Sequence, residues 1–82
     1  MDEQEELKHK VVYRTKDVTV LDGTIGTHRF TVYQDPTVVR VTFLPYDEQE
    51  ETTCFAQYFQ SPIEVENPKD LLSYVEVFGE LL

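Results

Sequence analysis

An alternating stretch at residues 37–44, reading Thr-Val-Val-Arg-Val-Thr-Phe-Leu, limits the fold of this chain more than any other segment. In a β-strand, Val39, Val41 and Phe43 would share one apolar face. Turn-forming residues flank the stretch, Gln-Asp-Pro before it and Pro-Tyr-Asp after it. The pattern predicts a central strand of an antiparallel sheet that buries one face against a core.

Further strand patterns lie on both sides of this stretch. Residues 28–33 alternate apolar and polar side chains, and residues 53–60 contain three aromatic residues. Residues 10–15 and 18–21 are rich in valine, and because only two residues separate them they are either two strands or one long bent strand. Residues 22–26, Asp-Gly-Thr-Ile-Gly, contain two glycines and predict a hairpin connection.

The strand expected at residues 53–60 has apolar side chains on both faces. If Phe55 and Phe59 face a helix, Ala56 and Tyr58 face outward, and the opposite orientation is equally compatible with the pattern. A strand that is apolar on both sides is typical of one that is covered twice. We therefore expect a helix on one side of it and a partner or second copy on the other.

The C-terminal segment carries the clearest helix signal. Asn67 is a favourable N-cap, Pro68 suits the first helical position, and the negative charge of Asp70 suits the helix N-terminus. Gly79 weakens the helix near its end. At helical spacing one broad face is apolar. It consists of Leu71, Tyr74, Val75, Phe78, Leu81 and Leu82.

Together these patterns predict an α+β fold, an antiparallel β-meander of about four strands with one C-terminal amphipathic helix packed on one face. We expect a single domain over residues 7–82, preceded by an acidic disordered tail at residues 1–6. The expected core is Val11, Val20, Phe30, Val32, Val39, Val41, Phe43, Phe55, Phe59, Leu71, Val75 and Phe78.

The net charge of −9 is concentrated in the second half of the chain. Residues 1–40 contain seven acids and six bases, whereas residues 41–82 contain nine acids and the single base Lys69. This balance disfavours direct binding to nucleic acid or to an anionic membrane and favours a basic partner surface. Because the sequence contains no apolar run of the roughly 18 residues that a membrane span needs, we expect a soluble, cytoplasmic protein.

Residues that could carry catalysis or bind a metal are few. His9 and His28 have no catalytic neighbour in the sequence, and Cys54 lies in a strand pattern typical of a small buried apolar residue. Residues 23–26 lack the spacing of a phosphate-binding loop, and residues 47–51 lack the glycine and the spacing of a calcium loop. We expect no enzymatic activity, no cofactor and no metal site.

The carboxylates of the second half are therefore the candidate functional groups. In size and charge the chain is similar to small acidic proteins of phages and mobile elements that block nucleases, repressors or polymerases by placing carboxylates where phosphates would lie. We expect a non-enzymatic protein that occupies a basic surface of another macromolecule. The alternative is a self-associating subunit, such as a homodimer, whose acidity serves solubility. The expected partner-binding residues are Asp47, Glu48, Glu50, Glu51, Glu64, Glu66, Glu76, Glu80, Tyr46 and Tyr58.

Overall fold

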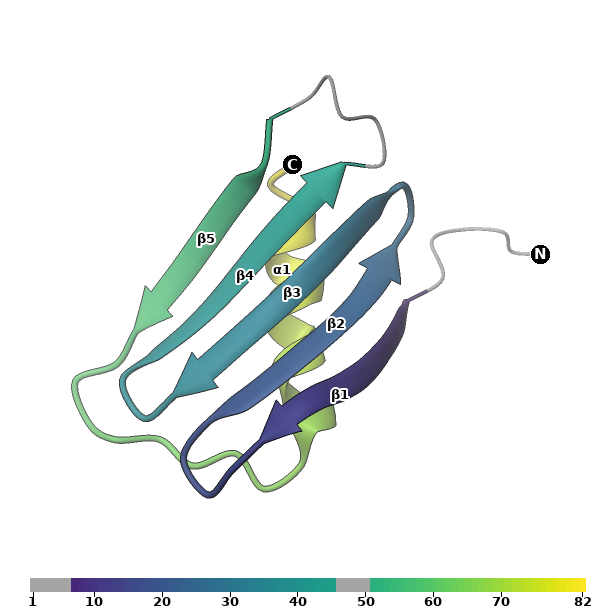
Figure 1. Cartoon of the computed structure of the whole chain (residues 1–82). Coiled ribbons are helices and arrows are strands. Elements are labelled where there is room, and N and C mark those ends of the chain that lie inside the picture. The colour runs from purple at the N-terminus through teal and green to yellow at the C-terminus, as the bar shows by residue number, and fades with distance from the viewer. Residues whose placement is uncertain (1–6, 46–50) are drawn as a thin grey trace.

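The computed structural model describes residues 7–45 and 51–82, and it shows a five-stranded antiparallel sheet with one helix across one face (Figure 1). The strands lie in the sheet in chain order, so each strand pairs with the next. This is the α+β meander that the sequence predicts, with one strand more than the four expected. The elements are β1 (Lys8–Arg14), β2 (Thr19–Ile25), β3 (His28–Asp35), β4 (Val38–Pro45), β5 (Thr53–Tyr58), the 3₁₀ helix η1 (Pro68–Leu71) and the helix α1 (Leu72–Gly79).

The additional strand arises because the two N-terminal strand patterns form a hairpin and not one bent strand. β1 and β2 are antiparallel neighbours joined by a tight turn, in which the amide of Thr15 donates to the carbonyl of Val18 at 2.8 Å. The hydroxyl oxygen of Thr15 accepts hydrogen bonds from the amides of Asp17 and Val18, at 3.3 and 3.1 Å. Threonine therefore supplies a turn of the kind usually made by asparagine or aspartate.

The next connection is shorter than predicted. Residues 22–25 belong to β2, and only Gly26 and Thr27 form the turn between Ile25 and His28. Gly26 has a φ of 59°, which the first central position of a type II′ turn requires and glycine adopts without strain. The expected five-residue connection was therefore wrong, because Gly23 is a strand residue whose missing side chain makes room for its neighbours.

The turn between β3 and β4 is built around the carboxylate of Asp35. Its Oδ1 accepts hydrogen bonds from the amides of Thr37 and Val38, at 2.8 and 3.1 Å, and from the Thr37 hydroxyl at 2.9 Å. Its Oδ2 accepts one from the hydroxyl of Tyr33 at 3.1 Å. These bonds, the Thr37 amide foremost, favour the ionised form and hold the pKa of Asp35 below its usual value. The same carboxylate raises the pKa of Tyr33.

The core lies between the sheet and the helical segment. Leu21, Phe30, Val32, Val39, Val41, Phe43, Leu71 and Val75 are buried and form one cluster. Two of the predicted core residues are wrong. Val11 is 44% exposed in the edge strand β1, and Val20 lies on the other face of the sheet because its neighbour Leu21 pairs with Val32 in the row that faces α1. Phe55, Phe59 and Phe78 are only partly buried and pack against the cluster.

The C-terminal segment begins where its capping residue predicts. The Asn67 side chain accepts a hydrogen bond from the amide of Lys69 at 3.0 Å, and the first turn is a 3₁₀ helix that continues into α1. The expected apolar face reaches the core only in part, because Leu81 and Leu82 follow the end of α1 and are exposed. The helix therefore contributes its first turns to the core and leaves its last turn at one end of the sheet.

Candidate functional site

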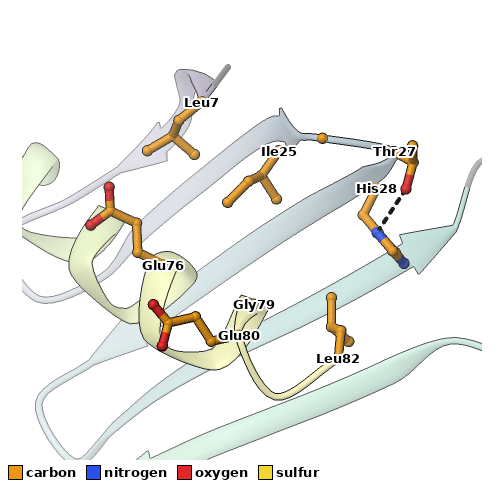
Figure 2. Close-up of a pocket in the computed structure, with 9 residues that line it drawn as sticks. Leu7, Ile25, Thr27, His28, Glu76, Gly79, Glu80 and Leu82 are labelled. Carbon is orange, nitrogen blue, oxygen red and sulfur yellow. Dashed lines mark hydrogen bonds between the residues drawn. The ribbon is translucent and has the colours of Figure 1, made fainter. Parts of the chain in front are cut away.

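A half-open pocket of about 490 Å³ lies where the end of α1 meets the turn between β2 and β3 (Figure 2). We refer to it as the acidic pocket. Glu76 and Glu80 line it from the helix, four residues apart, with the amide of Glu80 donating to the carbonyl of Glu76 at 3.3 Å. Helical residues at this spacing lie on the same side, so the two carboxylates reinforce each other's negative potential. The remaining lining residues are Leu7, Ile25, Gly26, Thr27, His28, Gly79 and Leu82.

The pocket combines apolar walls with negative charge. Leu7, Ile25 and Leu82 contribute hydrocarbon surface to the lining. Figure 2 shows Leu7 and Ile25 on the side of Glu76, and Leu82 on the far side of Gly79 from the Glu80 carboxylate. No lysine or arginine is among the described residues that line it. A lysine or arginine side chain has the complementary character, a hydrocarbon stem with a cation at its tip. The pocket therefore fits one basic side chain of a partner better than it fits an anion or a purely apolar group.

His28 closes the pocket on the side of the sheet. Its Nδ1 lies 3.4 Å from the hydroxyl of Thr27, and its ring meets Phe43 edge to face with centroids 6.4 Å apart. These two contacts orient the imidazole at the end of β3. It lies in the same pocket as the glutamates, which the sequence had not indicated, because β3 and α1 are distant in the chain and meet only through the fold.

The predicted carboxylates fall into separate places. Glu64 and Glu66 are exposed in the segment between β5 and η1, at the end of the sheet opposite the acidic pocket (Figure 1). This segment is held to β1, because Arg14 Nη2 donates to the carbonyls of Val65 and Glu66 at 2.7 and 3.2 Å. Glu51 is exposed just before β5. Tyr46, Asp47, Glu48 and Glu50 lie outside the described residues.

Tyr58 is not on the side of the carboxylates. Phe55 pairs with the buried Val41 and stacks on Phe78 of α1 with ring centroids 5.1 Å apart, so it faces the helix. Alternation along β5 then places Tyr58 on the opposite face, where it is 71% exposed. The same alternation exposes Cys54, contrary to the expectation of a buried thiol. The structure therefore separates Tyr58 from Glu76 and Glu80 by the thickness of the sheet.

Residue-by-residue reading of the sequence missed a set of cations on that second face. Lys8 and Lys10 in β1, Arg29 in β3 and Arg40 in β4 are all exposed, and the register places all four on the side away from α1. The guanidinium carbon of Arg40 lies 4.9 Å from the centre of the Tyr33 ring. Arg29 and Arg40 occupy positions next to the core residues Phe30, Val39 and Val41, and this alternation is the signal that could have identified them. Lys8 and Lys10 are next to no core residue, so only the pairing of β1 with β2 assigns them to this face.

The role of the acidic pocket has to be inferred from the residues that line it. Within residues 7–45 and 51–82, no group of three or more histidine, cysteine or acidic side chains is arranged to hold a metal ion. Among the same residues, no helix has the length and apolar character needed to cross a membrane. Comparison with known proteins adds no relative, since no family model, no curated protein and no solved structure matches this chain.

Proposed function

We propose that this protein is a non-enzymatic binding protein that occupies a basic surface of another macromolecule, with the acidic pocket receiving one lysine or arginine of that partner. The observation that carries the proposal is that Glu76 and Glu80 line one pocket together with apolar side chains. A basic side chain would bury its stem against Leu7 and Ile25 and bring its cation to the negative end of the helix at Glu76 and Glu80.

Further carboxylates lie on the helix side, at the other end of the sheet from the acidic pocket (Figure 1). Glu64, Glu66 and Asp70 are exposed near the start of η1, and Lys69 is the only base between residues 51 and 82. Such a charge distribution steers a basic partner to the helix side and accelerates association at low salt. A partner surface covered in this way is closed to nucleic acid, so binding of this protein would inhibit or regulate a protein that binds DNA or RNA.

The test begins with capture of partners from a native lysate on the immobilised protein, with elution in salt steps and displacement by added DNA or RNA. The captured partner is then titrated against the double variant Glu76→Gln/Glu80→Gln. We expect its affinity to fall roughly 10- to 100-fold, because two charge-assisted contacts of roughly 1.5 kcal/mol or more are weakened.

A control variant, Asp17→Asn/Asp22→Asn, removes the same number of carboxylates away from the helix side. It should bind the partner within about twofold of the parent chain, which is less than 0.5 kcal/mol. Equal losses in the two variants would mean that total charge and not the acidic pocket determines binding. Capture that is insensitive both to salt and to nucleic acid would contradict the proposal as a whole.

Self-association is the second candidate, and the free edge of β5 favours it. The amide of Phe59 donates to the carbonyl of Thr37 at 2.9 Å, and hydrogen-bonded pairs alternate along antiparallel strands. Cys54, Ala56 and Tyr58 therefore direct their backbone groups to the open edge, in an arrangement symmetric about Ala56. β5 carries no charge, whereas the other edge, β1, is protected by lysines and by a shift of register after Val11.

If β5 edges pair, the apparent molecular mass of the protein should rise with its concentration even at high salt. High salt weakens electrostatic association, whereas backbone pairing persists. Sedimentation at several concentrations measures this mass. Ala56→Pro, which lacks the outward amide, should remain folded and monomeric, because proline is tolerated on the free side of an edge strand. A monomer mass for the parent chain at every concentration would exclude this candidate.

A further inference from the structure

The face of the sheet turned away from α1 carries a row of side chains that the acidic pocket does not use. The register aligns Tyr13, Val20, Tyr33, Arg40 and Ala56, one residue from each strand. Leu21, Val32 and Val41, the next residues along the three inner strands, are buried against the helix side, so alternation places the Tyr13 row on the open face. Tyr13 is 56% exposed in this row.

The open face also has a charge opposite to that of the whole chain. Among the described residues, the register assigns it four exposed cations, Lys8, Lys10, Arg29 and Arg40, and two carboxylates, Asp22 and Asp35, a local net charge of +2. Both carboxylates are already engaged. Asp22 accepts a hydrogen bond from the Thr31 hydroxyl at 3.1 Å. Asp35 accepts one from the amide of Thr37 in the turn between β3 and β4.

Three of the cations converge on one place. Lys8, Lys10 and Arg29 line a shallow open hollow of about 340 Å³, together with His9, Asp22, Gly23 and Thr24. The fourth cation, Arg40, lies over the half-buried Tyr33 ring in a cation–π contact. One cation therefore lies over an aromatic ring and three share a hollow, on a face that no described element covers.

We propose that this open face binds single-stranded nucleic acid, with Tyr13 and Tyr58 stacking on bases, the Arg40 guanidinium that lies over Tyr33 receiving a third base, and Lys8, Lys10 and Arg29 contacting phosphates. Strands about 4.8 Å apart place Tyr13 and Tyr33, two strands from each other, roughly 10 Å apart. This separation suits unstacked bases and excludes neighbouring bases of a duplex, and a flat sheet face cannot enter a duplex groove. The combination of stacking rings and cations is what non-specific single-strand binding requires.

This function goes beyond the proposed one and uses the opposite side of the sheet, so each can fail without the other. The negative total charge, which argued against nucleic acid in the sequence, weakens binding at long range. The local field of the open face acts within about 10 Å at 0.1 M salt, the range at which phosphates would contact the lysines. We therefore expect measurable binding at low salt and a steep loss as salt rises.

The experiment is fluorescence anisotropy of a labelled 12-nucleotide oligo(dT) titrated with the full chain at 50 and 200 mM salt. Neutralisation of about three phosphates predicts a slope of log affinity against log salt near −2. Tyr13→Ser and Lys10→Gln should each weaken binding, by roughly tenfold and threefold at 50 mM salt. Lys69→Gln, the matched loss of a cation on the helix side, should change the affinity less than twofold.

Thermal melts of each variant exclude loss of fold as the cause of weaker binding. A conservative variant, Tyr33→Phe, should retain the affinity, because stacking needs the ring and not the hydroxyl. Absence of binding at 50 mM salt would overturn the proposal. Equal effects of Lys10→Gln and Lys69→Gln, or equally tight binding of a polyglutamate peptide in place of the oligonucleotide, would also overturn it, because the face would then be a general anion-binding surface at most.

Discussion

Val41→Asp is expected to abolish cooperative folding. Val41 is fully buried in β4, where it pairs with Val32 on one side and Phe55 on the other and belongs to the cluster beneath α1. A chain of this size is stable by roughly 4–12 kcal/mol. An unpaired carboxylate in this position must remain desolvated or become protonated, and the surrounding apolar side chains offer no hydrogen-bond partner. Circular dichroism should show no sigmoidal melt.

The neighbouring residue provides the control. Thr42 is half-buried on the open face, where its hydroxyl donates to the Cys54 sulfur at 3.4 Å. Thr42→Asp introduces the same carboxylate one position away, and it should melt cooperatively because the new charge reaches water. If Val41→Asp melted like the parent chain, the assignment of the Val41 side chain to the helix side of the sheet would be wrong.

Gly23→Ala is expected to lower the free energy of unfolding by roughly 2–3 kcal/mol, the upper part of the range for overpacking. A Cβ at this position would overlap the backbone carbonyl oxygen of Lys8 and come within 2.6 Å of Cζ of the Phe30 ring. Phe30 is buried in the core and Lys8 is held in the β1–β2 pairing, so neither can retreat cheaply. Urea denaturation measures the change.

Gly79, the last residue of α1, gives a matched comparison. A Cβ there would meet Ile25 Cδ1 at 3.8 Å and Phe43 Cζ at 3.9 Å, which are ordinary contact distances. Gly79→Ala should therefore raise the free energy of unfolding by about 0.5–1 kcal/mol, through better helix propensity and a filled gap. If Gly23→Ala raised the free energy of unfolding as Gly79→Ala does, backbone entropy and not the close approach at Gly23 would dominate.

Elements whose signals are local were predicted well. Alternation placed Val39, Val41 and Phe43 on one face of β4, and the Asn67 cap placed the start of the helical segment. The N-terminal hairpin was left undecided because its turn depends on hydrogen bonds to Thr15, a residue with weak turn preference. Gly23 was misassigned to a turn for a different reason: the Phe30 ring and the β1 backbone that exclude a side chain there are distant in the chain and visible only after pairing.

In the candidate site, too, local features could be predicted from the sequence and contacts between distant segments could not. Glu76 and Glu80 could be identified as acidic residues on one helix face, but their meeting with His28 and Leu7 required β3, α1 and the N-terminal strand to converge. Tyr58 was grouped with the carboxylates because the orientation of β5 was open. The stacking of Phe55 on Phe78 determines that orientation, and it places Tyr58 on the far side.

By itself, the sequence determined the fold class, the residues that form most of the core and a total charge of −9. These follow from composition, from the two-residue and 3.6-residue periods and from capping, all of which act over short distances along the chain. Only the tertiary structure decided how charge is distributed in space. The helix covers one face of the sheet, so the carboxylates around η1 and α1 lie on that side, and strand alternation sends Lys8, Lys10, Arg29 and Arg40 to the other. A sum of charges carries no direction, whereas packing one helix on one face of a sheet gives the molecule two sides of opposite sign.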